Sequence, residues 1–445
     1  AGPFREQGNF WRGGVWQMGW ANYFFGEMQV NQPQLPAGLS DEERQRLMRD
    51  FSIKQDSAIT QEDYLKARMH LPVIELGEVL GAPQTELEDY LRRGPSDPAW
   101  DDDRITNGET PKVPGLYAEA LYDISARSGT ARFEQTRAAS APGTQALMLI
   151  NGQHCSYRRQ NEDGTIGERP IGDMRFDYDA RELSFLNHWM KGDAEAPLPA
   201  QPVTVYMAGV NRWVSFDAVP KAGTSETKTF YLSGGGAANT LEGDGALLTD
   251  APDAAATDTF EYDPADPVIS HGGEISGMGP DQEDGAYDQR EIEAREDVLV
   301  YTSDVLEEDL PVFGSINTEL FVSSDAPDTD FTVKLVDVAP DGTAWNIADT
   351  ILRMRYRDGM DHAVFMTEGE TYAITPPPML AGNVFLKGHR VRIEVSSSNF
   401  PSYARSLNTA GDQYTTTETA VATNAVHHGP MALSRIELPV VALPE

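Results

Sequence analysis

The second half of this chain is a long series of short strand-like segments, and this pattern limits the possible folds more than any other feature. From about residue 200, short runs of alternating apolar and polar residues are separated by Gly, Pro, Asp and Asn. In one run, Val391, Ile393 and Val395 alternate with charged residues, as in an antiparallel strand with one buried face. Repeated strands with turns between them predict an all-β domain over residues 200–445, a C-terminal jelly-roll β-sandwich.

The first half shows helical and mixed patterns instead. Three S/T-x-x-E/D signals, each typical of a helix start, predict a helical unit over residues 40–97; they begin at Ser40, Thr60 and Thr85. Residues 98–199 then alternate strand, helix, strand, helix, which predicts a parallel α/β unit. Residues 1–39 are rich in aromatic residues and Gly and are assigned to the same α/β domain.

The α/β unit has too few strands to stand alone. Only two parallel strands are recognised in residues 98–199, and a two-stranded parallel sheet leaves both edges and much of its faces uncovered. The pattern therefore predicts part of a larger α/β domain.

Composition excludes several kinds of protein. The formal net charge of −35 disfavours a nucleic-acid-binding surface, which needs clustered Lys and Arg. No apolar run reaches the length of a membrane span, so a soluble protein is expected, either cytoplasmic or exported. The single cysteine, Cys155, excludes an internal disulfide. None of these features decides between a monomer and a homo-oligomer.

Two residues at predicted strand ends carry the main chemical signal. Asp123 follows the first strand of the α/β unit, and His154 follows the second, 31 residues later. Because the carboxyl ends of parallel strands meet at one edge of a sheet, these side chains are expected to lie together. A carboxylate that orients an imidazole suits the acid and base of a Ser-His-Asp triad. The alternative for His154 is a loop histidine with a structural hydrogen bond.

The expected nucleophile is absent from the sequence. In the α/β-hydrolase order the Ser precedes the Asp, within a G-x-S-x-G turn, yet no such motif occurs in the 445 residues. The missing turn and the missing strands together predict that the Ser is supplied by an N-terminal hydrolase segment absent from this chain, either from the same precursor or from a separate chain.

The motifs around these residues resemble a known family. VPGLYAEALYD (113–123) and LINGQH (149–154) are similar to the Asp and His segments of the X-Pro dipeptidyl-peptidase/cocaine esterase (CocE/NonD) family, which includes glutaryl and cephalosporin acylases. Further similar segments follow in order, among them FLNHWMKG (185–192), PVTVYMAGVNRW (202–213), DTDFTVKLVDVAPDG (328–342) and FLKGHRVRIEVSSSNFP (385–401).

The resemblance implies a fold and an activity. The fold is α/β plus all-β: the second half of an α/β-hydrolase domain with a helical cap at 40–97, followed by the jelly roll. The activity is serine-type acyl hydrolysis of a small-molecule ester or amide through an acyl-enzyme, with Asp123 and His154 as catalytic residues and no cofactor. The missing Ser implies that this chain alone is inactive.

Departures from the family bear on the substrate. The α-amino acid ester hydrolases carry acidic residues two and three places after the catalytic Asp, where they hold an ammonium group; here these are Ser125 and Ala126. A cationic substrate is therefore disfavoured. Ser125 falls where relatives line the acyl pocket and is assigned as a substrate-binding residue.

Other candidates have simpler explanations. Cys155 as a nucleophile is disfavoured because adjacent residues usually point apart and nothing nearby lowers its pKa. His427-His428 and Asp101 to Asp103 lack metal-ligand spacing, so no metal is expected. For Asp328 and Asp330, structural roles are favoured over catalysis. For the N-terminal aromatic residues, core packing and an acyl-pocket lining are equally compatible.

A second function class remains beside the enzyme. Because the nucleophile is missing, the chain is also compatible with a non-catalytic binding or assembly module, built on the jelly roll with a vestigial hydrolase domain.

Overall fold

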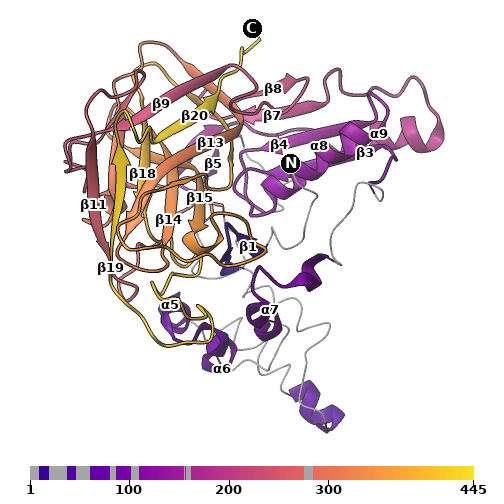
Figure 1. Cartoon of the computed structure of the whole chain (residues 1–445). Coiled ribbons are helices and arrows are strands. Elements are labelled where there is room, and N and C mark those ends of the chain that lie inside the picture. The colour runs from indigo at the N-terminus through magenta and orange to yellow at the C-terminus, as the bar shows by residue number, and fades with distance from the viewer. Residues whose placement is uncertain are drawn as a thin grey trace.

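The computed structural model describes residues 10–19, 38–46, 61–80, 87–101, 110–154, 156, 162–274 and 284–444. Figure 1 shows a large β-sandwich beside a smaller sheet flanked by α8 and α9, with the short helices α5 to α7 below the sandwich. Strands account for more of the described residues than helices do. Within the described residues, no helix is both long and apolar enough to cross a lipid bilayer.

The sandwich encloses the largest apolar core. The long strand β13 (Leu310–Ser324) pairs with β16, β17, β19 and β20 at different points along its length. The other strands are β9 (Thr227–Ser233), β10 (Ala246–Leu248), β11 (Ala256–Tyr262), β12 (Leu299–Ser303), β14 (Asp330–Val338), β15 (Ala344–Arg353), β16 (Tyr372–Ile374), β17 (Met379–Phe385), β18 (Arg390–Ser396), β19 (Ala422–His428) and β20 (Arg435–Pro439). Almost all pairs are antiparallel, as the alternating sequence predicts; the jelly-roll connectivity stays a prediction.

The smaller sheet has the order β3-β4-β7-β8. Its strands are β3 (Gly115–Ala120), β4 (Gln145–Ile150), β7 (Val203–Met207) and β8 (Arg212–Phe216); the first three are parallel and β8 is antiparallel. Helix α8 (Ala126–Ala139) links β3 to β4, and α9 (Tyr178–Lys191) follows β4, with the hairpin of β5 (Gly164–Ile166) and β6 (Arg169–Gly172) between them. The two parallel strands that the sequence predicts within residues 98–199 are β3 and β4.

The position of β7 differs from the sequence-based expectation. The run 202–210 was expected to begin the sandwich, but β7 pairs with β4 and brings β8 with it. All five residues of β7 are buried, and a short continuous apolar run fits a parallel strand and a sandwich strand equally well. Only the pairing partner distinguishes the two. The predicted domain ranges themselves stay a prediction.

Helix α9 has clear local start and stop signals. The side chain of Asp177 accepts a hydrogen bond from the backbone N–H of Ala180, and Gly192 ends the helix with a left-handed φ of 71°. The spacing of Leu183, Leu186 and Met190 predicts an apolar face for this helix, but all three side chains are exposed to solvent, while Tyr178 and Phe185 of the same helix are buried.

The N-terminal segments form a third, aromatic core. The hairpin of β1 (Trp11–Arg12) and β2 (Val15–Trp16) buries both of its tryptophans. Helices pack around it: α5 (Gln61–Met69), α6 (Leu76–Val79) and α7 (Leu87–Arg93), with the 3-10 turns η2 (Val73–Glu75) and η3 (Pro98–Asp101). For Trp11 and Trp16, core packing is therefore the observed role; Trp20, Tyr23, Phe24 and Phe25 lie outside the described residues.

One of the three predicted helix starts is visible. The backbone N–H of Ser40 donates to Glu43 Oε2 at 2.9 Å, and the backbone N–H of Glu43 donates to Ser40 Oγ at 3.2 Å, which is the reciprocal pattern of a capping box. Thr60 and Thr85 lie outside the described residues. Whether residues 40–97 act as a cap over a catalytic site stays a prediction.

A buried ion cluster joins all three parts. Glu274 Oε2 lies 3.1 Å from a guanidinium nitrogen of Arg12 on β1 and 3.1 Å from Nε of Arg127 on α8. Arg12 also donates to the Tyr403 hydroxyl at 2.5 Å, and this hydroxyl donates to Asp349 of the sandwich at 2.8 Å. A buried carboxylate needs such partners, because leaving it unpaired costs several kcal/mol.

Removing one member of this cluster should destabilise the chain. We expect Arg12→Ala to lower the free energy of unfolding by about 3 kcal/mol, because the buried Glu274 carboxylate loses one of the two guanidinium groups that contact it among the described residues. The control is Arg92→Ala, which breaks the exposed pair with Asp89 and should cost less than about 1 kcal/mol. Urea unfolding measures both, and equal midpoints would contradict a structural role for the cluster.

Candidate active site

Asp123 and His154 meet at one edge of the smaller sheet. The pairing of β3 with β4 continues past the strands, since the backbone N–H of Leu121 donates to Ile150 O at 2.8 Å and that of Tyr122 to Gly152 O at 3.2 Å. The two following loops are therefore held together. His154 Nδ1 lies 2.5 Å from Asp123 Oδ2, so the structure brings together the two residues that the sequence placed at neighbouring strand ends.

The two members of this pair differ in exposure. The Asp123 side chain is 7% exposed, whereas the His154 side chain is 44% exposed. Asp123 Oδ1, the oxygen that does not face His154, accepts hydrogen bonds from the backbone N–H and the hydroxyl of Ser125, both at 2.8 Å. Ser125 thus fixes the carboxylate on the side away from His154, and the imidazole ring is partly exposed to solvent.

Asn151 anchors the loop that carries His154. Its side-chain amide donates to Tyr206 O of β7 at 2.6 Å and to Gly382 O of β17 at 2.9 Å. Asn151 is 4% exposed, and its two acceptors come from the smaller sheet and from the sandwich. The position of His154 therefore depends on the sandwich as well as on β4.

Two further acids surround the pair. Gln153 Nε2 donates to Asp284 Oδ1 at 2.7 Å, and the backbone N–H of His154 also bonds to the Asp284 carboxylate. Burial raises the pKa of Asp284 to about 6, with a smaller contribution from the Asp123 charge. Burial is also the main cause that raises the pKa of Glu119 on β3 to about 8, and the negative charge of Asp123 is the second cause.

Sequence reasoning missed these supporting residues for different reasons. Glu119 is a charged residue within a strand that the sequence marks as apolar, four positions before Asp123, and this was a usable signal. Asp284 lies 130 residues after His154 in an acidic stretch with no local feature that points to the site. Asn151 follows β4 directly, but its acceptors become visible only in three dimensions.

The structure also describes Ser125, the predicted substrate-binding residue, but not Cys155, which the sequence disfavours as a nucleophile. The Ser125 hydroxyl faces Asp123 and Glu119, and its contact with an acyl group stays a prediction. Cys155 lies outside the described residues. Among the described residues, no group of three or more His, Cys, Asp or Glu is arranged to hold a metal ion.

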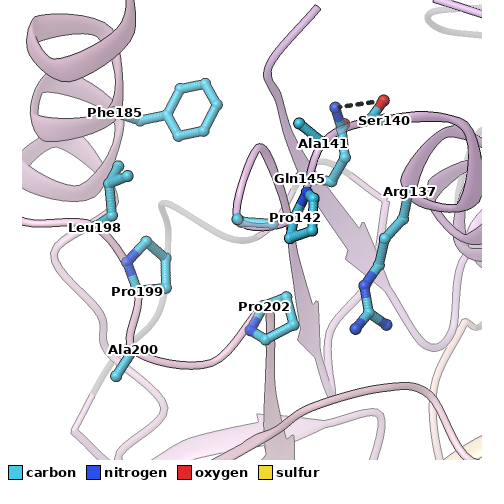
Figure 2. A pocket seen from close by; sticks show the side chains of 12 residues that line it. Arg137, Ser140, Ala141, Pro142, Gln145, Phe185, Leu198, Pro199, Ala200 and Pro202 are labelled. Carbon is cyan, nitrogen blue, oxygen red and sulfur yellow. Dashed lines mark hydrogen bonds between the residues drawn. The ribbon is translucent and has the colours of Figure 1, made fainter. Parts of the chain in front are cut away.

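One pocket lies at the other end of β4. It has a volume of about 380 Å³, and Figure 2 shows Phe185, Leu198 and Pro202 around it. Gln145, the first residue of β4, also lines it, whereas His154 follows the last residue of the strand. A six-residue strand is roughly 20 Å long, so a ligand in this pocket would not reach the imidazole.

Comparison with known proteins identifies the family. Residues 199–437, more than half of the chain, match the X-Pro dipeptidyl-peptidase C-terminal non-catalytic domain, and the chain belongs to this domain family. The resemblance seen in the sequence motifs is thereby confirmed.

Individual proteins and solved structures are also similar to this chain. The chain is similar to cocaine esterase from Rhodococcus sp. (strain MB1 Bresler), with 42% identity over 260 residues that cover 58% of this chain and 45% of that protein. The chain thus spans less than half the length of this relative. Two solved structures share the fold at 22% identity, each covering 97% of this chain and 70% of the other: an aminopeptidase from a Thaumarchaeota archaeon (TM-score 0.77) and an α-amino acid ester hydrolase (TM-score 0.75).

The anchor of the His154 loop can be tested directly. Asn151→Asp keeps the size of the side chain but replaces the donating amide by an oxygen that faces the carbonyls of Tyr206 and Gly382. We expect a loss of at least about 2 kcal/mol in the free energy of unfolding, measured in urea at neutral pH. In the control Asn211→Asp, an exposed side chain that accepts from Gly209 N still accepts, so the change should stay within about 0.5 kcal/mol. Similar losses in both variants would contradict the anchoring role.

Proposed function

We propose that this chain is the Asp- and His-bearing part of a serine-type acyl hydrolase that acts on a small-molecule ester or amide. The observation that carries the proposal is the 2.5 Å contact between Asp123 Oδ2 and His154 Nδ1 at the carboxyl ends of two parallel strands. The family and the 42% identical cocaine esterase support hydrolase chemistry. In this proposal residues 98–199 are the second half of an α/β-hydrolase domain.

The chemistry follows from the geometry of the pair. Asp123 accepts a hydrogen bond from the Nδ1–H of His154, so Nε2 is the basic atom of the ring. His154 Nε2 removes the proton of a Ser hydroxyl as the Ser oxygen attacks the substrate carbonyl, and it then returns the proton to the leaving alcohol or amine. Water, activated by the same nitrogen, clears the acyl-enzyme. The buried Asp123 carboxylate stabilises the imidazolium formed in each step.

The Ser is proposed to come from a segment outside this chain. Strand β3 is the outer strand of the smaller sheet, and among the described residues it pairs with β4 alone. Its residues are mostly half-buried, whereas all six residues of β4 are buried. An unpaired strand edge is a template for another strand. A Ser-bearing segment that adds strands to β3 would extend the sheet and bring its own strand ends to the edge where His154 lies.

No cationic substrate group is assigned to Ser125. Its hydroxyl is bonded to Asp123, and its position carries no charge of its own. The proposal therefore names an ester or amide and assigns no ammonium subsite.

A fluorophosphonate probe, which labels activated serines, tests the proposal. We expect no labelling of this chain alone and rapid labelling of a complete protein that also contains the Ser-bearing segment. In that complete protein, His154→Ala should abolish turnover, and Asp123→Asn should lower kcat by roughly 10³–10⁴-fold because the ring takes the wrong tautomer. The control His362→Ala changes an exposed histidine and should label like the parent.

The outcome also decides the second candidate function. Residues 199–437 match a domain described as non-catalytic, which favours a binding or assembly role for the sandwich itself. Absence of labelling in the complete protein, together with retention of the chain on an immobilised glycan or polyester, would support that role and contradict the hydrolase.

A further inference from the structure

A second carboxyl group lies behind the catalytic acid of the proposed triad. Ser125 Oγ is 2.8 Å from Asp123 Oδ1 and 3.4 Å from Glu119 Oε2, so one hydroxyl lies between two acids. A hydroxyl has one proton to donate. The shorter distance assigns that proton to Asp123, and the longer contact with Glu119 is then favourable only if Glu119 carries a proton of its own.

The surroundings of Glu119 fit a neutral carboxyl group. Its side chain packs against α8 at Gly129, where a Cβ atom would lie only 1.8 Å from Glu119 Oε1. Among the described residues, the titratable groups whose charges act on it are Asp123 and His154, while the segment leading into α8 contributes the Ser125 hydroxyl. Burial and the Asp123 charge disfavour its ionised form, and together they raise its pKa to about 8.

We propose that Glu119 is a positioning residue, and that a hydrogen-bonded chain from Glu119 through Ser125 and Asp123 to His154 holds the catalytic acid in place while Glu119 is protonated. The inference deepens the proposed function and rests on it for the role of Asp123 and His154. In the protonated state Glu119 donates to Ser125 Oγ, Ser125 donates to Asp123 Oδ1, and Asp123 Oδ2 accepts a hydrogen bond from the Nδ1–H of His154.

Ionisation of Glu119 would remove its proton, so that Glu119 could only accept a hydrogen bond from the Ser125 hydroxyl. Two carboxylates would then compete for the single Ser125 proton, so the hold on Asp123 Oδ1 weakens. The added negative charge near His154 also favours the imidazolium over the neutral base. The site would therefore be ordered for catalysis at neutral pH and less ordered above a pH of about 8.

The His154 ring reports this coupling without any need for activity. The chain is labelled with ¹³C at His Cε1, the His154 signal is assigned by its absence in His154→Asn, and the pH is raised from 5 to 10. We expect a main step from the imidazole and a second step near pH 8 from Glu119. Glu119→Gln, whose amide donates at every pH, should lose the second step and keep the first.

Two matched variants separate Glu119 from its neighbours. Asp284→Asn removes the other acid next to His154, whose pKa is about 6, and should leave the step near pH 8 in place. Ser125→Ala removes the bridging hydroxyl and should reduce the size of that step. A parent curve with one step, a second step that survives Glu119→Gln, or a step undiminished in Ser125→Ala would each overturn the proposal.

Stability gives an independent readout if a variant gives poor spectra. The pKa of Glu119 is raised from 4.5 when unfolded to about 8 when folded, so the folded chain binds the extra proton between these values. Its contribution to stability therefore falls as the pH rises through that window. Urea unfolding of the parent should lose stability between pH 5 and 8 relative to Glu119→Gln, and parallel curves would contradict a protonated Glu119.

Activity of the complete protein separates the two proposals. We expect kcat of the parent to fall above pH 8 with little change in KM, and kcat of Glu119→Gln to stay level over that range. Fluorophosphonate can fail to label the complete protein while the His154 titration still shows the coupled step. In that case the hydrolase proposal fails, and the proposed hydrogen-bonded series from Glu119 to His154 is supported. If labelling occurs and the coupled step is absent, the hydrolase proposal is supported and the proposed role of Glu119 is contradicted.

Discussion

The burial of β4 is the constraint on which the rest of the structure depends. All six of its residues are buried, with β3 on one side and β7 on the other. Helix α8 packs against β3 and β4, and residues of the sandwich join the same apolar cluster. The approach is close at Gly382, where a Cβ atom would lie 3.0 Å from Val205 Cγ2. Since the loop after β4 carries His154, the packing that buries the strand also fixes the position of His154.

Buried charge pairs provide a second level of organisation. The chain has only 35 Lys and Arg residues against 70 Asp and Glu residues, yet several of its arginines are buried in ion pairs with carboxylates. Arg353 bonds both carboxylate oxygens of Asp330 at 2.8 and 2.9 Å, and Arg355 bonds Asp328. These contacts agree with the structural roles favoured for the two acids from sequence. Arginine suits such places because its planar fork matches a carboxylate.

The relation between sequence and site is uneven. Asp123 and His154 were recognisable because each directly follows a short apolar strand, and parallel pairing brings such positions together. The strand β7 was recognised as a strand but given the wrong sheet, because an apolar run carries no record of its partner. Asp284 reaches His154 from a distant segment, and only long-range packing could show it.

The sequence by itself determined the segments and the chemistry that they can carry: alternating strands after residue 200, a strand-helix-strand unit before it, and an acid and an imidazole at matching strand ends. These are local properties, since they depend on residue spacing and on the type of side chain. The tertiary structure alone decided which strands share a sheet, that Glu274 holds three parts of the chain together, and that Glu119 lies behind Asp123. These depend on contacts between residues that pack together only in the folded chain, or on burial, which no spacing in the sequence records.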